Sequence, residues 1–244
     1  MDNLPAETPI YRYMALDTFL YFFTSRSLVV QRVSSWPDFF EGKRFQFFKK
    51  NGLIDTPYSP DDYFGSSWSL QQDDSRLFNS ERGFERSCEE IRDLGSAAMW
   101  EAYCKGGGIR VKTTIGKVLA LLGAHKELWH GKVYYEPSLD FTKRPESIEE
   151  TLFHKRTCFR HEDEYRFILR SQDRVDLLDF QINDMREFVD EFLISPSRNP
   201  WISRAIYQLV AYSPISLRRD GVNSKDSRQY CRISLMYGYV PEEL

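Results

Sequence analysis

The chain has 244 residues, of which 41% are hydrophobic and 15% aromatic, so it can bury a sizeable core, which argues against a disordered protein. Its formal net charge of −3 argues against binding nucleic acid through a broad basic surface. The net charge does not exclude a local basic groove. There is no CxxC pair among the four cysteines, and residues 1–9 lack the features of a secretory signal. The apolar run Phe19–Phe23 is too short to span a bilayer. We therefore expect a soluble cytoplasmic protein without a membrane segment.

Strands and helices alternate irregularly in the first half of the chain. Asp17 or Thr18 is expected to cap a helix that runs to about Ser25, and Asn51-Gly52 is expected to end another. Gly65 is expected to allow a close backbone approach within its strand. The apolar patterns predict strands at 10–14, 28–33 and 63–70, and helices at 17–25, 41–50 and 80–105, the last stopped by three glycines at 106–108.

The second half shows the same mixture. Ser147 followed by Glu150 forms a capping-box pattern, which predicts a helix from there to about Phe159. The patterns predict further helices at 115–125 and 201–212, and strands at 109–113, 132–135, 161–169, 175–182, 192–194 and 232–237. Because there is no regular βαβ alternation, repeat or linker, we expect a single α+β domain over residues 1–244, with its core at about 10–237.

The segment His161–Leu169 carries an unusual row of charges. If it is a strand, Glu162, Glu164 and Arg166 share one face at a spacing of about 6.6 Å, and Ile168 continues that face toward the core. Two carboxylates and a guanidinium at the start of a buried strand are explained either as a ladder of salt bridges or as the edge of an active site.

Two earlier strands carry further candidates. Arg12 lies between Tyr11 and Tyr13, so its guanidinium points away from these rings, either as an exposed edge residue or as a fork for a phosphate or carboxylate. Ser67 and Ser69 share a face, which is either exposed to solvent or lines a polar cleft and orients a carboxylate or a ribose.

Other patterns are weaker. Trp100 and Tyr103 lie on one helical face, where Trp100 is best explained as a core residue and Tyr103 can reach a cleft. His154, Cys158 and His161 form an H-x3-C-x2-H pattern whose first two members would share a helix face. No fourth ligand is evident, and the spacing matches no standard zinc pattern, so no metal is expected.

Taken in order, these motifs resemble a bacterial domain-of-unknown-function family. Its members show an opening L-Y-R-Y, an N-D-P-F-E segment, a serine-containing strand, W-x-x-Y with a glycine and a strand, V-x-Y, a lysine and W-x-x-E-x-E-x-R. The counterparts here are Tyr11-Arg12-Tyr13, Trp36–Glu41, Ser66–Leu70, Trp100 and Tyr103 with Gly108, Val133-Tyr134-Tyr135, Lys155, and Phe159 leading into Glu162–Arg166. Two departures are Phe159 in place of the family's tryptophan and Cys104-Lys105-Gly106 in place of a histidine-containing run.

That pattern in turn resembles the Arg…Ser…Glu-x-Glu signature of ADP-ribosyltransferases. The resemblance implies a split, mostly antiparallel sheet flanked by helices, and an enzyme that uses NAD as its substrate without a metal. Glu164 would be the catalytic carboxylate at the ribose, and Glu162 would act on the acceptor. NAD would be bound by Arg12, Tyr13, Ser67, Ser69, Tyr103 and Arg166.

The implied acceptor is a macromolecule, either protein or nucleic acid, and the type of family suggests a bacterial toxin or phage-defence effector with an antitoxin or immunity partner. Two other hypotheses stay open. One is a Mg2+-dependent nucleic-acid processing enzyme that uses Glu162, Asp163 and Glu164, although a D…ExK pattern is missing. The other is a binding module without catalysis, whose Glu162/Glu164/Arg166 face pairs with a partner. The enzyme hypothesis requires Arg12, the serine face and Glu164 to converge.

Overall fold

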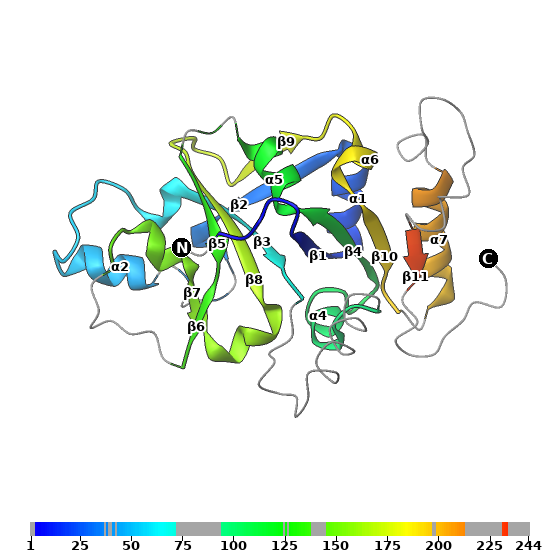
Figure 1. The fold of residues 1–244 in the computed structure, drawn as a ribbon, viewed down its shortest axis with the longest axis horizontal. Helices are drawn as coiled ribbons and strands as arrows, with labels where there is room; N and C mark the ends of the chain where they lie inside the picture. Colours follow the sequence, from blue (N-terminus) through cyan, green and yellow to red (C-terminus); the bar gives the residue numbers. More distant parts are fainter. Residues whose placement is uncertain are drawn as a thin grey trace. The chain divides into compact units, whose positions relative to one another are not determined.

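The chain divides into two compact units. The computed structural model describes residues 3–36, 38, 41, 43–71, 94–123, 125, 127–137, 145–196, 199–212 and 231–233 (Figure 1). The first unit comprises the described residues within Met1–Thr8, Ser27–Leu70 and Ile115–Gln181. The second comprises those within Pro9–Arg26, Gln71–Thr114 and Ile182–Leu244.

Five antiparallel strands form the sheet of the first unit. The strand β8 (Glu164–Arg170) pairs with β5 (Leu128–Lys132) on one side and with β3 (Tyr63–Ser69) on the other. The strand β2 (Ser27–Arg32) then pairs with β3 and with β9 (Leu177–Gln181). The first six residues of β8 are buried, as expected for a central strand with a run of aromatic and aliphatic side chains.

Shorter elements complete the first unit. They are the helices α2 (Lys43–Lys50) and α5 (Ile115–Leu122), and a parallel two-stranded sheet of β6 (Tyr134–Glu136) and β7 (His154–Arg156). The 3-10 helices are η1 (Val33–Ser35), η2 (Pro60–Asp62), η4 (Glu149–Phe153) and η5 (Thr157–Glu162). One core cluster joins α2, β3, η4 and β8, and consists of Val33, Phe45, Tyr63, Ile148, Leu152, Phe153 and Ile168.

The second unit contains the strand order β1-β4-β10-β11. Antiparallel pairing joins β1 (Pro9–Ala15) to β4 (Gly108–Thr114) and β4 to β10 (Glu191–Ile194), whereas β10 and β11 (Cys231–Ile233) are parallel. The helices of this unit are α1 (Leu16–Ser25), α4 (Ala97–Tyr103), α6 (Met185–Phe188) and α7 (Pro200–Tyr212). Phe19 and Phe23 of α1 pack their rings against Phe192 of β10.

The expected α+β class with mostly antiparallel strands is confirmed. Most predicted elements occur within one or two residues of their expected bounds. Among the exceptions, the helix predicted at 115–125 ends at Leu122, and the strand predicted at 132–135 is divided at Val133 between β5 and β6. The parts of the predicted elements at 80–93 and 234–237 lie outside the described residues. Among the described helices, none is long and apolar enough to cross a membrane. The single domain and the likeness to ADP-ribosyltransferases stay predictions.

The predicted cap of α1 is wrong. The helix already begins at Leu16, and its N-cap residue, Ala15, offers no side-chain acceptor. Asp17 lies inside the first turn, where its carboxylate accepts from the backbone N–H of Thr18 at 2.7 Å. A carboxylate in the first turn still stabilises the helix through the helix dipole. Asp17 therefore correctly indicated that a helix begins nearby, but it is not the residue that caps it.

The predicted helix from Ser147 to Phe159 is also wrong. The segment instead forms η4, the strand β7 and η5. Ser147 does accept a hydrogen bond from the N–H of Glu150 at 3.2 Å, as the capping pattern predicts. The helix then fails because β-branched and aromatic residues follow, such as Thr151 and Phe153, and because β7 finds a strand partner in β6.

The charged strand begins later than predicted. Glu162 is the last residue of η5, Asp163 has a left-handed backbone (φ 43°), and β8 starts at Glu164. Asp tolerates this conformation better than most residues. The prediction that Glu162 shares a strand face with Glu164 and Arg166 is therefore wrong, whereas Ile168 does lie in the core on the Glu164 face, as predicted.

Candidate functional site

Small residues surround Arg166 and Glu164 on their face of the sheet. The β3–β8 register places Ser67 opposite Arg166 and Ser69 opposite Glu164, and Gly131 of β5 lies opposite Arg166 on the other side. Directly opposed residues of antiparallel strands point to the same face. The two serines therefore share the face of the two charged residues, as the polar-cleft hypothesis requires.

Trp36 packs against the same face of the sheet. Its indole lies against Gly65, where a Cβ atom would be only 2.2 Å from Trp36 Cζ2. The guanidinium of Arg166 stacks over the same indole at 4.6 Å from the ring centroid. Gly65 thus permits a close approach, as predicted, although the approaching group is a side chain rather than a backbone.

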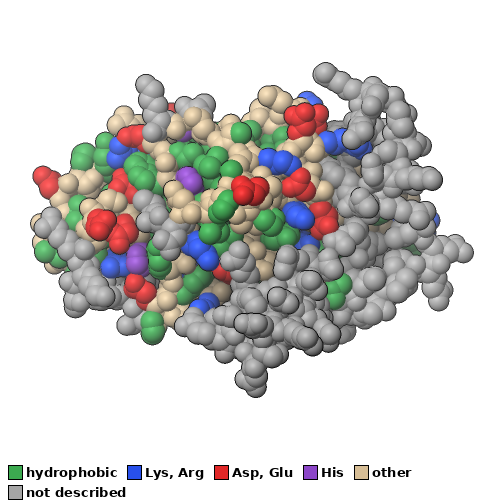
Figure 2. Space-filling model, in the orientation of Figure 1, with side chains coloured by type: hydrophobic (Ala, Val, Ile, Leu, Met, Phe, Trp, Pro, Cys, Tyr) green, Lys and Arg blue, Asp and Glu red, His purple; other side chains and the backbone are tan. Residues whose placement is uncertain are grey.

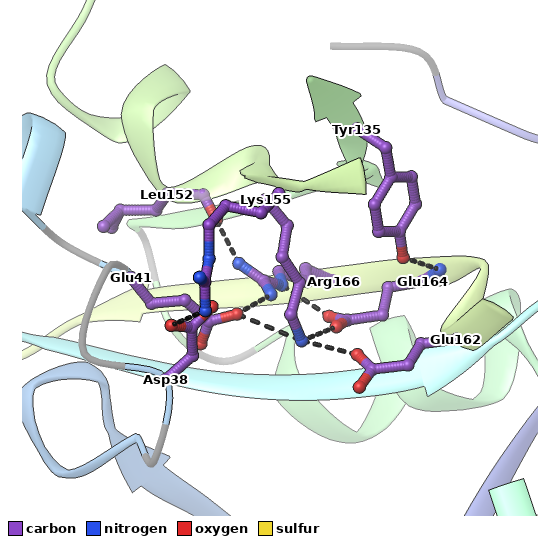
Figure 3. A network of polar contacts seen from close by, with 9 residues as sticks. Asp38, Glu41, Tyr135, Leu152, Lys155, Glu162, Glu164 and Arg166 are labelled. Atoms are coloured by element: carbon purple, nitrogen blue, oxygen red, sulfur yellow. Dashed lines mark hydrogen bonds and ion pairs between the residues drawn. The ribbon is translucent and has the colours of Figure 1, made fainter. Parts of the chain in front are cut away.

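Lys155 lies at the centre of three carboxylates. Its Nζ atom is 2.5 Å from Glu162 Oε2, 2.7 Å from Glu164 Oε1 and 3.2 Å from Glu41 Oε1. Figure 3 shows the lysine side chain reaching from β7 toward these three acidic residues. We call Glu41, Lys155, Glu162, Glu164 and Arg166 the carboxylate cluster.

Arg166 is the second cation of the cluster. Its Nε donates to Glu164 Oε2 and its Nη2 to Glu41 Oε1, both at 2.6 Å, while Nη1 donates to the carbonyl oxygen of Leu152 at 2.7 Å (Figure 3). The cluster side chains are between 1% and 8% exposed. At such burial, charges are stable only when paired and hydrogen-bonded, and this network meets that requirement.

Further residues fix the edges of the cluster. The backbone N–H of Glu164 donates to the hydroxyl of Tyr135 at 2.9 Å. Arg156 donates to Asp38 at 3.0 Å, which ties β7 to the segment that precedes Glu41. Lys155 and Arg156 both lie over the ring of Phe159, at 4.7 and 5.1 Å from its centroid. These contacts hold Lys155, Glu41 and Glu164 in fixed positions.

The pKa values of Glu162 and Glu164 are shifted in opposite directions. Burial and the neighbouring Glu164 carboxylate raise the pKa of Glu162 to about 7. Burial acts in the same direction on Glu164, but Arg166 and Lys155 outweigh it and hold the pKa of Glu164 well below its usual range. Lys155 is also buried, yet Glu164 and Glu41 raise its pKa, so it stays cationic. The cluster thus offers a proton-exchanging carboxyl beside a fixed carboxylate, a pattern that separates acid–base from charge-stabilising roles.

The other predicted site residues belong to the second unit. Arg12 in β1 is partly exposed, and burial of its guanidinium lowers its pKa to about 10, so it is cationic at neutral pH. Tyr103, at the end of α4, is 42% exposed. The convergence of Arg12 and Tyr103 with Glu164 stays a prediction.

Tyr13 is a core residue of the second unit. Its ring packs edge-on against Trp100, with 4.7 Å between the ring centroids. Its hydroxyl accepts from the N–H of Ser96 at 2.8 Å and also bonds the Gln71 amide. Trp100 is buried, as predicted. These contacts give Tyr13 a packing role, and its contact with a cofactor stays a prediction.

His154 and Cys158 do not share a helix face, because β7 and η5 replace the expected helix. His154 bonds Glu136 through Nδ1 at 2.9 Å, and its pKa is lowered by burial and by Arg44. Within the described ranges, no group of three or more His, Cys, Asp or Glu residues is arranged to hold a metal ion.

Neither Lys155 nor Glu41 was predicted as a site residue from the sequence. A signal for both was present, since Lys155 and the Trp36–Glu41 segment belong to the ordered motif set. Arg110 was missed altogether. It is fully buried in the second unit, where it bonds Gln71 at 2.8 Å and Glu191 at 3.0 Å. Its position between Ile109 and Val111 in a strand gives no warning of these partners.

Comparison with protein-family models, with curated proteins and with solved structures finds no match for this chain.

Proposed function

We propose that the protein is an ADP-ribosyltransferase-like enzyme that uses NAD as its substrate and modifies a macromolecular acceptor, with the carboxylate cluster as its catalytic centre. The observation that carries this proposal is the pair Glu162 and Glu164 on one lysine, with pKa values driven in opposite directions. Two carboxylates in such different states suit a reaction that needs both charge stabilisation and proton transfer.

In this proposal Glu164 acts on the bond that breaks. When the bond from the ribose C1′ to the nicotinamide nitrogen breaks, nicotinamide leaves with the bonding electrons and positive charge develops on the ribose. A carboxylate that stays ionised stabilises that charge and hydrogen-bonds the 2′-hydroxyl more strongly in the transition state. Arg166 and Lys155 keep Glu164 ionised and in place.

Glu162 acts on the acceptor. An acceptor hydroxyl or amine attacks C1′, and its proton passes to the carboxylate form of Glu162. A base with a pKa near 7 is well matched to this transfer at neutral pH. Ser67 and Ser69 lie opposite Arg166 and Glu164, where their hydroxyls can orient the ribose or the carboxylate. We propose further that Arg12, Tyr13 and Tyr103 contact the dinucleotide.

The proposed biological role rests only on the type of bacterial family that the sequence motifs resemble. We propose a cytoplasmic toxin or phage-defence effector whose partners are NAD, an acceptor protein or nucleic acid, and an antitoxin or immunity protein.

The experiment is a nicotinamide-release assay with NAD, in the presence and absence of a cell lysate as the source of acceptors. We expect Glu164→Gln to lower release at least about 100-fold, because the neutral amide cannot stabilise the developing charge. Glu162→Gln should lose the lysate-dependent part and keep slow hydrolysis by water.

The matched control is Glu149→Gln. Glu149 is also a buried glutamate of the first unit, but it accepts from Tyr63 and pairs with Arg170. Release by this variant should equal that of the wild type. Equal release by wild type and Glu164→Gln, or none by the wild type with lysate, would overturn the proposal.

A further inference from the structure

Lys155 contacts the carboxyl group of Glu162 directly, and Glu41 is linked to that carboxyl group through Lys155. Lys155 Nζ bonds Glu162 Oε2 and also lies 3.2 Å from Glu41 Oε1, which in turn accepts from Arg166. The three residues Glu41, Lys155 and Glu162 come from separate parts of the chain. Glu41 lies just before α2, Lys155 in β7 and Glu162 at the end of η5.

The charges of the cluster do not balance when every group is ionised. Three carboxylates then face two cations, which leaves one negative charge in excess at a buried site. Protonation of one carboxyl removes the excess. Glu41 and Glu164 each contact both cations, and Glu162 Oε2 lies 2.5 Å from Lys155 Nζ. Burial and the adjacent Glu164 carboxylate favour Glu162 as the group that takes the proton.

We propose that Glu41 and Lys155 are positioning residues that act on Glu162 in opposite directions, Lys155 favouring its carboxylate form and Glu41 favouring its carboxylic acid form. Glu41 does so by sharing both cations, so that less positive charge is available to Glu162. This inference deepens the proposed function, because it assigns the control of the same acid–base residue.

Charged groups from several described elements lie around the cluster. The charged and titratable groups that face the cluster are Asp38 and Glu41 before α2, Tyr135 of β6, Lys155 and Arg156 of β7, and Glu164 and Arg166 of β8. Asp38 and Arg156 form their own pair and Tyr135 is neutral, its pKa raised by burial and by Glu164. Within the carboxylate cluster, Glu41, Lys155, Glu164 and Arg166 can move the proton affinity of Glu162.

Two substitutions should move the titration of Glu162 in opposite directions. Glu41→Gln keeps the shape of the side chain but removes a negative charge, so the two cations act more strongly on Glu162 and its titration midpoint should fall by about one pH unit. Lys155→Met removes the cation that bonds Glu162, so the midpoint should rise by about one unit or more. A merely structural role would give loss of stability in both variants without opposite shifts.

The experiment is carboxyl 13C NMR of the whole protein labelled at glutamate Cδ and titrated from pH 4 to 9, with Glu162→Gln used to assign the Glu162 signal. We expect the wild-type signal to titrate near neutrality, a lower midpoint in Glu41→Gln and a higher one in Lys155→Met. Lys155→Arg keeps the charge and should stay nearer the wild type than Lys155→Met. Glu149→Gln should leave the midpoint unchanged.

Shifts of the same sign in Glu41→Gln and Lys155→Met, or no shift in either, would overturn this inference. If Lys155→Met does not fold, the wild type and Glu41→Gln still decide it, since a wild-type midpoint near the ordinary value for glutamate of about 4.3 would be enough to reject it. The readout requires no NAD. Opposite shifts without nicotinamide release would therefore contradict the proposed function alone, and release without opposite shifts would contradict this inference alone.

Discussion

Glu162 connects the charge of the cluster to the stability of the fold. Its pKa is about 7 in the folded protein, against about 4.3 for an ordinary glutamate in an unfolded chain. Between these two values the folded state holds a proton that the unfolded state has lost. The contribution of Glu162 to the free energy of unfolding is therefore largest at low pH and decreases as pH rises through this window.

Glu162→Gln removes this dependence, because an amide does not titrate. From pH 5 to pH 7.5 we expect the wild type to lose roughly 1–3 kcal/mol of unfolding free energy relative to the variant. Urea unfolding of both proteins at half-unit pH intervals measures the difference. Glu164 does not interfere, since its lowered pKa places its own contribution below the window. A difference that stays constant, or that grows in favour of the wild type as pH rises, would contradict the prediction.

At the scale of elements, the fit of Trp36 against β3 holds one wall of the cluster in place. A Cβ on Gly65 would lie 2.2 Å from Trp36 Cζ2 and 2.7 Å from Cη2. Gly65→Ala must therefore displace the indole, which also lies under Arg166. We expect a loss of about 1–3 kcal/mol in the free energy of unfolding, measured in urea.

Gly106→Ala is the matched control for this substitution. Apart from its chain neighbours, no atom of the described residues lies within 4 Å of the Cβ position at Gly106, and its backbone is outside the left-handed region. Its free energy of unfolding should stay within about 0.5 kcal/mol of the wild type. Equal effects of Gly65→Ala and Gly106→Ala would show that the indole does not need the space that Gly65 leaves.

The elements that could be predicted from sequence are those in which the spacing of apolar residues stays regular from one end of the element to the other. The strand at 63–69 and the helix at 200–212 are examples, since burial on a strand or along a helix face dominates their free energy. The segment from 147 to 162 could not be predicted. Its capping pattern is real, but its continuation is decided by pairing of β7 with β6, a contact between segments about 20 residues apart.

The candidate site was predictable in part for the same reason. Ser67 and Ser69 were placed on the correct face because strand alternation is a local rule, and the register with β8 then brings that face to Arg166 and Glu164. Glu162 was assigned to the same strand, which is wrong. Its carboxylate still meets Glu164 because both bond Lys155, a cation that no local rule places there.

At the scale of the whole molecule, the net charge bears on whether the protein binds nucleic acid. The formal net charge is −3. On the face of the molecule drawn in Figure 2, the coloured acidic and basic side chains are intermingled and form no separate acidic or basic patch. The carboxylate cluster is buried and holds three acidic and two basic side chains. Binding to nucleic acid without sequence preference depends on phosphate contacts from exposed Lys and Arg.

We therefore expect no measurable binding to duplex DNA of random sequence at 150 mM salt, with a dissociation constant weaker than about 100 μM in fluorescence anisotropy. Repeating the titration at 50 mM salt separates two explanations. A basic protein gains affinity steeply as salt falls, whereas this chain should gain little, because few counterions would be released. Binding below about 1 μM at 150 mM salt would contradict this expectation. It would also favour the nucleic-acid processing hypothesis over an NAD-using enzyme with a protein acceptor, and Mg2+-dependent cleavage of the same DNA, abolished by a chelator, would then decide between them.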